Sequence, residues 1–463
     1  MHISHSIQAY VRFSARPAVI VALALQMGSI AAVAGDQIKL GRELFLHKWV
    51  ANDPLSPEGD GLGPMHNADS CVACHHLGGT GGAGPANSNV EILSVAAAGG
   101  DLTDSQKSTI RANAAKIHPA LFSSTVLHRF STAPDYERWR LAVLGFKLPA
   151  DRQSKKAAVV MRAVHRKQTN QPPVADLPRQ KGVPLQLIQR NTTALFGAGL
   201  IDSISEKTLT ELARTQAERF PGIHGRVAHT ADGKVGRFGW RGQVSTLREF
   251  VLTACAMELG LQNADHLQAR DPLHPDSKLL GNDLTSEQCD ALVAFIVSLP
   301  APEQLPPLDQ RHANALNNGE RLFETIGCAG CHVRDIGQVA GIFSDLLLHD
   351  MGPELEDPLP AMPERIKVGT VSMGSTGYGG GGVMDIFAEA QTSVRREWKT
   401  APLWGVRDSA PYLHDGRART LEEAIVTHGG EAESSASRFR QLGAPERSNV
   451  LTFLQSLAGP PQR

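Results

Sequence analysis

Cys71-Val72-Ala73-Cys74-His75 and Cys328-Ala329-Gly330-Cys331-His332 are the two stretches that decide the fold of this 463-residue chain. C-x-x-C-H is the attachment signature of c-type haem: each cysteine forms a thioether with one vinyl group, and the histidine binds the iron. Zinc sites also use paired cysteines, but they give no reason for a histidine directly after each pair. The sequence therefore predicts two covalently bound haems, with His75 and His332 as iron ligands.

The bulk composition excludes some classes of protein. Hydrophobic residues make up 41% and charged residues 20% of the chain, which is ordinary for a globular protein. The formal net charge is −1 at pH 7, so no basic excess points to a nucleic-acid partner. Aromatic residues make up only 5% of the chain, which fits a core that two large, flat haem groups help to fill.

The N-terminal residues are typical of an export signal. Arg12 and Arg16 precede an apolar stretch that ends in Ala32-Val33-Ala34, an A-x-A cleavage pattern. A membrane anchor is the alternative, but polar residues interrupt the stretch, whereas a span needs about 20 apolar residues. We expect cleavage after about Ala34 and a periplasmic chain without a membrane span. In that compartment Cys255 and Cys289 either form a disulfide or remain buried thiols.

Similar stretches recur in the same order in the two halves of the chain. Gly41–Phe45 precedes the first haem motif and Gly319–Phe323 precedes the second, each as the start of a short amphipathic helix. Each half also closes with apolar residues at helical spacing that end at Leu299 and Leu457, followed by Pro or Gly. The pattern predicts a mainly α-helical fold of two cytochrome c-like domains with long loops, related by a weak internal repeat.

A third pair of stretches supports the repeat. Trp240–Glu249 and His414–Glu423 share Gly, Thr-Leu and Glu in register. In both, the threonine can cap a following helix, with a glutamate three residues on as a capping box.

The Pro-rich stretch 300–307 predicts an extended linker and therefore the domain boundary. We expect a signal peptide over 1–34, a first haem domain with the active site over 35–299, and an electron-transfer haem domain over 300–463. Residues at about 93–185 have no partner in the second half. They are interpreted as an insertion in the first domain that is mostly helical.

The face of each iron opposite its motif histidine decides the function. His428 lies fourteen residues after His414, and the equivalent position after Trp240 is Ala254. Alanine has no ligand atom, so the first iron is expected to keep an open position. Glu258 lies one helical turn further on the same face, where its carboxylate could move a proton. A second imidazole from His428 would instead saturate the second iron for electron transfer.

Other residues compete for these roles. Met351, Met373 and His349 are alternative ligands of the second iron. A histidine of the insertion, His118 or His128, could close the first iron and leave a plain electron-transfer cytochrome. A third hypothesis is an oxygenase, or an enzyme that modifies a partner protein, at the same open iron.

The chain resembles the bacterial diheme cytochrome c peroxidase and MauG superfamily, and within it the diheme oxidoreductase (thiol oxidoreductase-like) branch. Besides the two haem motifs, Thr400–Gly405 and Ala410–Arg417 carry the resemblance, which covers residues 40–458 outside the insertion. Fourteen residues after the histidine of the second stretch, the peroxidases place a methionine and MauG a tyrosine. Here that residue is His428, which implies two axial histidines and a lower potential than a methionine-ligated haem.

The resemblance also implies roles in the first domain. The family's aromatic residue between the haems falls on Trp240. Its active-site carboxylate falls on Glu258, with a spacing two residues shorter. The family's active-site glutamine has no clear match, with Arg248 and Gln243 as candidates.

The peroxidases carry a histidine shortly after the first haem motif that blocks the iron, whereas Leu77–Lys116 contains no histidine. The first haem is therefore expected to be open in the oxidised protein, as in MauG. Hydrogen peroxide would react there. The electrons would come from a small cytochrome or cupredoxin, or from a substrate protein, through the second haem and Trp240.

Overall fold

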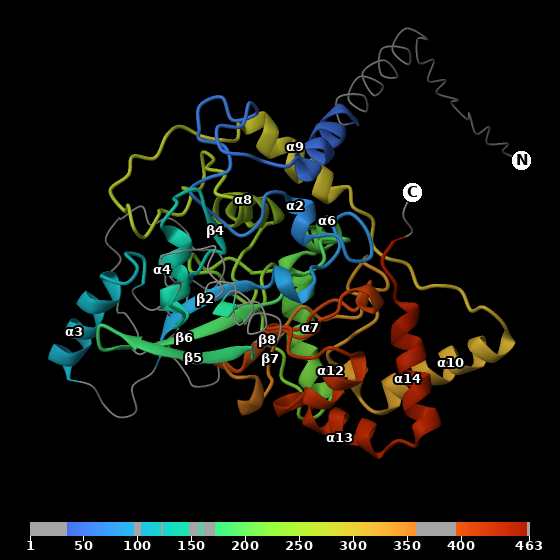
Figure 1. Cartoon of the computed structure of the whole chain (residues 1–463). Helices are drawn as coiled ribbons and strands as arrows, with labels where there is room; N and C mark the ends of the chain where they lie inside the picture. The colour runs from blue at the N-terminus through green and yellow to red at the C-terminus, as the bar shows by residue number, and fades with distance from the viewer. Residues whose placement is uncertain are drawn as a thin grey trace, which may run out of the picture.

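The computed structural model describes residues 35–96, 103–121, 124–147, 156, 159–160, 172–357 and 395–460 (Figure 1). The predicted signal peptide over 1–34 and the candidate ligand Met373 lie outside these ranges. As predicted, the architecture is mainly helical. Within the described ranges, no helix is both long and apolar enough to span a bilayer.

Residues 35–46 form the first described helix. The α-helices that follow are α2 (Cys71–Cys74), α3 (Asp104–Ala115), α4 (Tyr136–Val143), α6 (Ala198–Ser203), α7 (Glu206–Arg219), α8 (Leu247–Glu258), α9 (Ser286–Val297), α10 (Gln310–Thr325), α12 (Leu421–Thr427), α13 (Glu433–Gln441) and α14 (Ala444–Ser456). The strands are β1 (Met65–His66), β2 (Val90–Val95), β3 (Ser124–Val126), β4 (Phe130–Ser131), β5 (Val174–Gln180), β6 (Val183–Arg190), β7 (Leu348–Asp350) and β8 (Glu397–Lys399).

The first haem motif rests on two crossing helices. The 35–46 helix meets α9 at Gly41, where a Cβ atom would lie 1.9 Å from the carbonyl oxygen of Ala291. Only glycine permits this close approach. One turn further, the ring of Phe45 packs against Phe295 at a centroid distance of 5.2 Å and against His75 at 6.4 Å. The helix crossing therefore fixes the position of Phe45, whose ring packs against His75.

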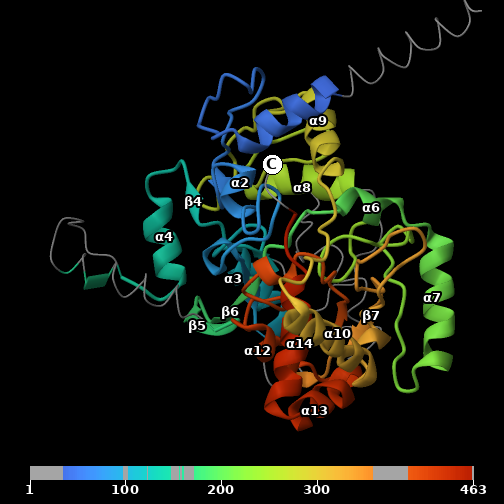
Figure 2. The same ribbon diagram turned by 90° about the vertical axis from the view of Figure 1, so that its right-hand side faces the viewer.

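The same packing recurs around the second motif, where α10 lies against α14 (Figures 1 and 2). A Cβ atom at Gly319 would lie 2.0 Å from the carbonyl oxygen of Asn449. The ring of Phe323 lies 5.3 Å from Phe453 and 6.3 Å from His332. The two phenylalanine rings and the histidine ring thus lie at similar distances from one another in both places, beside a glycine at the helix contact. Gly41 lies near the middle of the 35–46 helix and Gly319 just past the middle of α10, and neither lies at the start of its helix as predicted.

Threonines begin the two helices for which caps were predicted. The side chain of Thr246 accepts a hydrogen bond from the backbone N–H of Glu249 at the start of α8. Thr420 does the same for Glu423 at the start of α12, and the carboxylate of Glu423 accepts the N–H of Thr420 in return. The second helix therefore has the complete capping box.

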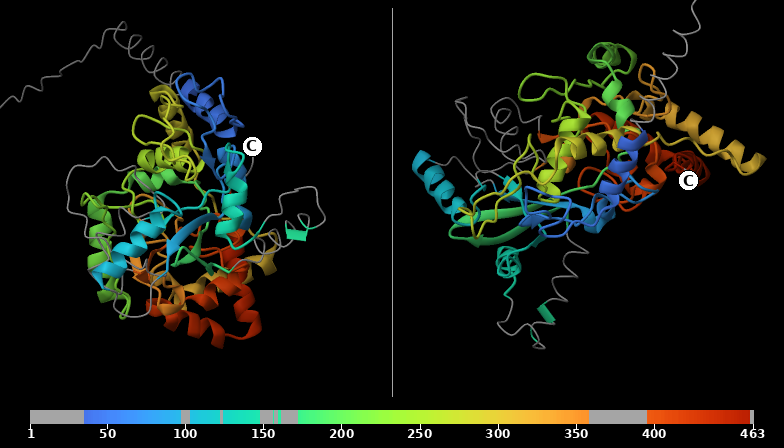
Figure 3. Two further views of the ribbon diagram at one scale, coloured as in Figure 1. Left: turned by 60° about the vertical axis from the view of Figure 1, so that its left-hand side comes forward. Right: turned by 90° about the horizontal axis from the view of Figure 1, so that it is seen from above.

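The prediction of a mostly helical insertion at about 93–185 is wrong. Its described residues contribute to an antiparallel sheet in the order β3-β2-β6-β5, beside α3 and α4. In β6, Val183, Leu185 and Leu187 are buried and alternate with more exposed residues, which is the period of a strand. Figure 3 shows α3 and α10 at opposite ends of the molecule, so the helix beside this sheet lies far from α10.

A buried ion pair ties this sheet to the helices. The Arg140 guanidinium of α4 pairs with the Glu91 carboxylate of β2, and both side chains are almost fully buried. Arg140 Nε also donates to the carbonyl oxygen of His128 at 2.9 Å, and Tyr136 Oη donates to the same oxygen at 2.7 Å. The segment that carries His128 is therefore held by groups with no access to water.

Replacing Arg140 by Met is expected to lower the free energy of unfolding by about 3–5 kcal/mol, because the Glu91 carboxylate is left buried without its partner. Urea denaturation followed by circular dichroism measures the change. The double variant Arg140→Met/Glu91→Leu is the control, since removal of both charges should restore much of the loss. If the single variant costs less than the double, the pair does not stabilise this region.

Candidate haem sites and active site

The first cavity, of about 460 Å³, lies above the first motif. Cys71, Cys74 and His75 line one side, and Ala254 and Glu258 of α8 line it as well. These two residues are four positions apart and therefore share a helix face. The structure thus brings the predicted open position and the predicted carboxylate into the same cavity as His75.

The second cavity, of about 310 Å³, is lined by Cys328, Cys331, His332 and His428. Both cavities lie in the range of about 300–1,000 Å³ typical of cofactor sites. Each combines a largely apolar wall with two thiols and at least one imidazole, which is the donor set that c-type haem requires. The residues present therefore fit two haem groups.

The three predicted iron ligands share a hydrogen-bond pattern. The Nδ1 atoms of His75, His332 and His428 lie 3.2, 2.9 and 2.7 Å from the carbonyl oxygens of Gly82, Phe343 and Ala424, respectively. Burial lowers the pKa of His75 and His332 to about 4 and also lowers the pKa of His428. Each ring is therefore neutral near pH 7, with Nδ1–H donated to the backbone, so the lone pair of the ring lies on Nε2. This arrangement orients a metal-binding imidazole.

His332 and His428 face each other across the second cavity. Their ring centroids are 6.5 Å apart. Two imidazoles on opposite sides of one metal ion have centroids about 6 Å apart, since each metal–nitrogen bond is about 2 Å long. His428 is the residue that ends α12 and not part of its body as predicted. In this position its Nδ1 bonds to the carbonyl oxygen of Ala424 in the last turn of α12, while the ring lies across the cavity from His332.

The competing ligands are placed differently. His349 lines the second cavity, but both of its ring nitrogens bond to carboxylates. Met351 also lines this cavity. His118 and His128 are not among the described residues that line the first cavity, and His128 Nε2 bonds to the carbonyl oxygen of Met257 at 2.7 Å.

Glu258 is held by one neighbour and opens toward the first cavity. Asn67 Nδ2 donates to Glu258 Oε2 at 2.6 Å. Among the described residues, Oε1 has no hydrogen-bond partner although it is buried. Burial raises the pKa of Glu258 to about 7, against the opposing effects of the Asn67 hydrogen bond and the nearby Arg129 charge. The carboxyl group can therefore gain or lose a proton near neutral pH.

Trp240 lines both cavities and thus lies in the wall between them. Its Nε1 donates to the carbonyl oxygen of Asn191 at 2.9 Å, which fixes the indole ring. Trp398 also lines both cavities and stacks on His414 at a centroid distance of 3.5 Å. Sequence analysis missed Trp398, because no motif surrounds it and its place depends on the pairing of β7 with β8.

Two further candidates are now distinguished. Gln243 lines the first cavity, whereas Arg248 is half-exposed and pairs with Asp290 at 2.6 Å. Of the two proposed matches for the family's active-site glutamine, only Gln243 is near the motif. Cys255 and Cys289 are both buried free thiols in the structure.

Comparison with known proteins gives a family. The family model "Di-haem oxidoreductase, putative peroxidase" matches residues 378–457. The chain is 31% identical over 160 residues to cytochrome-c peroxidase IdrP2 of Pseudomonas sp. (strain SCT), which covers 33% of this chain and 40% of the relative. It is 26% identical over 171 residues to hydrazine synthase subunit gamma of Kuenenia stuttgartiensis, which covers 36% of this chain and 48% of the relative. The chain thus matches less than half the length of either relative.

Two solved structures are similar to this chain. Kuenenia stuttgartiensis hydrazine synthase, pressurised with xenon, has a TM-score of 0.34 at 16% identity and covers 78% of this chain and 90% of that one. A MauG-like protein associated with microbial copper homeostasis has a TM-score of 0.28 at 18% identity and covers 55% of this chain and 90% of that one.

The class of protein that the family model indicates is the di-haem oxidoreductases. The chain matches the diheme cytochrome c peroxidase and MauG superfamily, as its motifs predicted, so the predicted resemblance is confirmed.

Proposed function

We propose that the chain is an exported diheme c-type oxidoreductase that reduces hydrogen peroxide in the first cavity. The observation that carries the proposal is the difference between the two cavities. His428 faces His332 in the second cavity, whereas Ala254 and Glu258 accompany His75 in the first. This asymmetry supports one iron saturated by two imidazoles and one with a vacant position beneath a carboxyl group.

The cofactors in this proposal are two haem c groups, attached at the motif cysteines, with His75 on the first iron and His332 and His428 on the second. When bound, the haems supply the electron-transfer chemistry, and the protein sets their ligands, access and proton supply. The backbone acceptors at Nδ1 of all three histidines support this ligand set.

Glu258 is the proposed proton carrier. Reduction of one hydrogen peroxide to two waters consumes two electrons and two protons, and one oxygen must leave with a proton that it did not have. Glu258, as a carboxylate, accepts a proton from the entering peroxide and returns it to the departing oxygen. Asn67 occupies Oε2, so the unpartnered Oε1 is the oxygen that carries the proton.

Trp240 is the proposed electron path between the haems. It lines both cavities, and its indole ring is fixed by the bond to Asn191. A small cytochrome, a cupredoxin or a substrate protein would supply the electrons to the second haem. The matching rings around His75 and His332 support two related haem domains over about 35–299 and 300–463. Cleavage after about Ala34 would deliver the chain to the periplasm.

The spin states of the two irons in the oxidised, ligand-free holoprotein test the proposal. Electron paramagnetic resonance should show one high-spin and one low-spin ferric haem per chain, because only one iron has two protein ligands. The high-spin signal should disappear when cyanide is added, while the low-spin signal should remain. Two low-spin signals before any ligand is added would overturn the proposal in favour of a plain electron-transfer cytochrome.

A further inference from the structure

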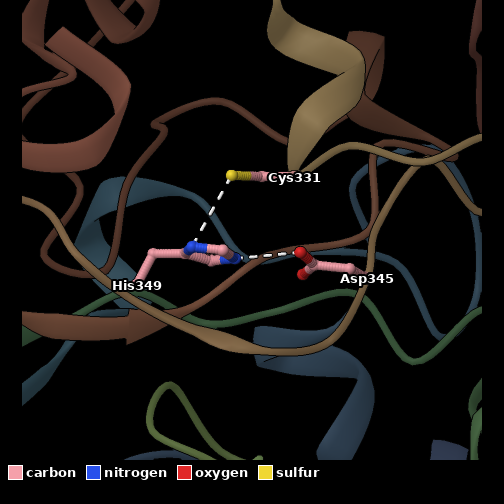
Figure 4. Close-up of side chains that lie close together, drawn as sticks. All are labelled: Cys331, Asp345 and His349. Carbon is pink, nitrogen blue, oxygen red and sulfur yellow. Dashed lines mark hydrogen bonds and ion pairs between the residues drawn. The ribbon is translucent and has the colours of Figure 1, made fainter. Parts of the chain in front are cut away.

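His349 is the centre of a buried cluster beside the second haem motif (Figure 4). Its Nε2 lies 2.9 Å from Asp345 Oδ2, and its Nδ1 lies 2.8 Å from Glu431 Oε2. Cys331 Sγ lies 3.7 Å from the same Nδ1 atom. The side chains of His349 and Asp345 are almost fully buried, and that of Glu431 is 16% exposed. The cluster therefore lies next to the sulfur that the second haem would use, and away from bulk water.

The geometry fixes the charge of this histidine. Ionised carboxylates only accept hydrogen bonds, so both ring nitrogens of His349 must donate, and the ring is an imidazolium. Burial by itself lowers the pKa of His349, but the hydrogen bonds to Asp345, Cys331 and Glu431 outweigh it and raise the pKa to about 12. The His349–Asp345–Glu431 triad thus holds two negative charges and one positive charge, with one net negative charge.

The surrounding chain holds the two carboxylates in place. Gln216 Nε2, on α7, donates to Asp345 Oδ2 at 2.7 Å and to the carbonyl oxygen of Gly330, within the haem motif, at 2.8 Å. The backbone N–H of Leu347 donates to Asp345 Oδ1 at 2.9 Å. The backbone N–H of His224 donates to Glu431 Oε2 at 2.8 Å. The charges are therefore fixed and cannot turn away when the charge of their neighbour changes.

A metal ion is a poorer interpretation of the cluster. Cys331, Asp345 and His349 offer three ligand atoms within 4.8 Å of one another. However, Cys331 belongs to the C-x-x-C-H motif, so its sulfur is committed to a thioether in the proposed holoprotein. Both nitrogens of His349 are protonated and have no lone pair for a metal. An ion would have to displace two strong hydrogen bonds.

We propose that the His349–Asp345–Glu431 triad is an electrostatic site that holds down the reduction potential of the second haem. The inference rests on the proposed function, since it requires a haem bound at Cys331. Reduction of the second iron adds one electron to a centre beside a fixed net negative charge. Charge in a buried environment is weakly screened, so the triad disfavours the reduced form. The second haem would therefore return its electron readily to the first.

Glu431→Gln in the holoprotein tests this proposal. The substitution keeps the shape of the side chain and removes one negative charge, while His349 retains its ion pair with Asp345. We expect the midpoint potential of the low-spin haem, measured by spectroelectrochemistry, to rise. Asp345→Asn removes the other negative charge and should also raise it. The high-spin haem in the first cavity should shift less, because the triad lies beside the second motif.

Glu433→Gln is the matched control. It removes a carboxylate two residues away, but this side chain is 57% exposed and pairs with Arg440 at the surface. Water and salt screen such a charge, so the potential should stay at the wild-type value. The proposal is overturned if Glu431→Gln and Asp345→Asn both keep the low-spin spectrum and leave the midpoint potential unchanged or lowered. Failure of the proposed function appears separately, as a wild-type protein without a low-spin haem that depends on His428.

Discussion

Replacement of Glu258 by Gln is expected to lower the rate of hydrogen peroxide reduction by about 10²–10⁴-fold, the usual contribution of a general acid–base group. The amide keeps the hydrogen bond to Asn67 within reach but cannot accept and return a proton. Steady-state turnover with a reduced small cytochrome measures the loss. Because the haem motifs are untouched, the optical spectrum of the oxidised variant should stay close to that of the wild type.

The pH dependence gives the same prediction a second readout. Since burial raises the pKa of Glu258 to about 7, the carboxylate that accepts the first proton forms only as the pH rises through that value. The wild-type rate should therefore increase between about pH 6 and pH 8, and this limb should vanish in Glu258→Gln. Glu287→Gln, at an exposed position of α9, serves as control and should keep both rate and profile. Turnover of Glu258→Gln within twofold of the wild type would contradict the role of this residue.

Replacement of His428 by Ala is expected to convert the second haem from low spin to high spin. His428 lies across the cavity from His332 and donates Nδ1–H to the backbone, so its lone pair lies on Nε2, and alanine would leave that side of the iron without a protein ligand. Electron paramagnetic resonance should show the low-spin signal replaced by a second high-spin signal. The rate of electron transfer from the second haem to the first should also fall. An iron without a fixed sixth ligand changes its coordination more when it gains or loses an electron, which slows the transfer.

Met351→Leu is the matched control, since Met351 lines the same cavity and was a competing ligand. It removes the thioether at similar volume, and the low-spin signal should persist. The opposite result, in which His428→Ala keeps the low-spin spectrum and Met351→Leu loses it, would assign the distal position to the methionine.

Several features of this protein were determined by short stretches of sequence. The attachment motifs, the caps of α8 and α12 and the glycines at the helix crossings all depend on residues within a few positions of one another. Such features can be predicted from sequence because the residues that form them are close together in the chain. The fourteen-residue spacing was enough to set His428 apart from Ala254, because the capped helix after each stretch carries that position to its cavity.

The strands of the insertion could also have been found from the sequence. The alternation of Val183, Leu185 and Leu187 has the period of a strand. A helix over these residues would place Leu185 on the face opposite Val183 and Leu187, whereas a strand places all three on one buried face.

Only the tertiary structure decided which groups act together. Asn67 meets Glu258 across 191 positions of sequence, and His349 meets Glu431 across 82. Burial of Glu258 raises its pKa to about 7 against the opposing Asn67 hydrogen bond. The carboxylates of Asp345 and Glu431 occupy both ring nitrogens of His349, which argues against this histidine as an iron ligand. The sequence does not give the distances between these residues. Burial, hydrogen bonds and charge change the pKa of a side chain only when the groups concerned lie close together in the fold. Local patterns therefore predicted two haem attachment sites, and long-range packing decided the chemistry of the groups around the two motifs.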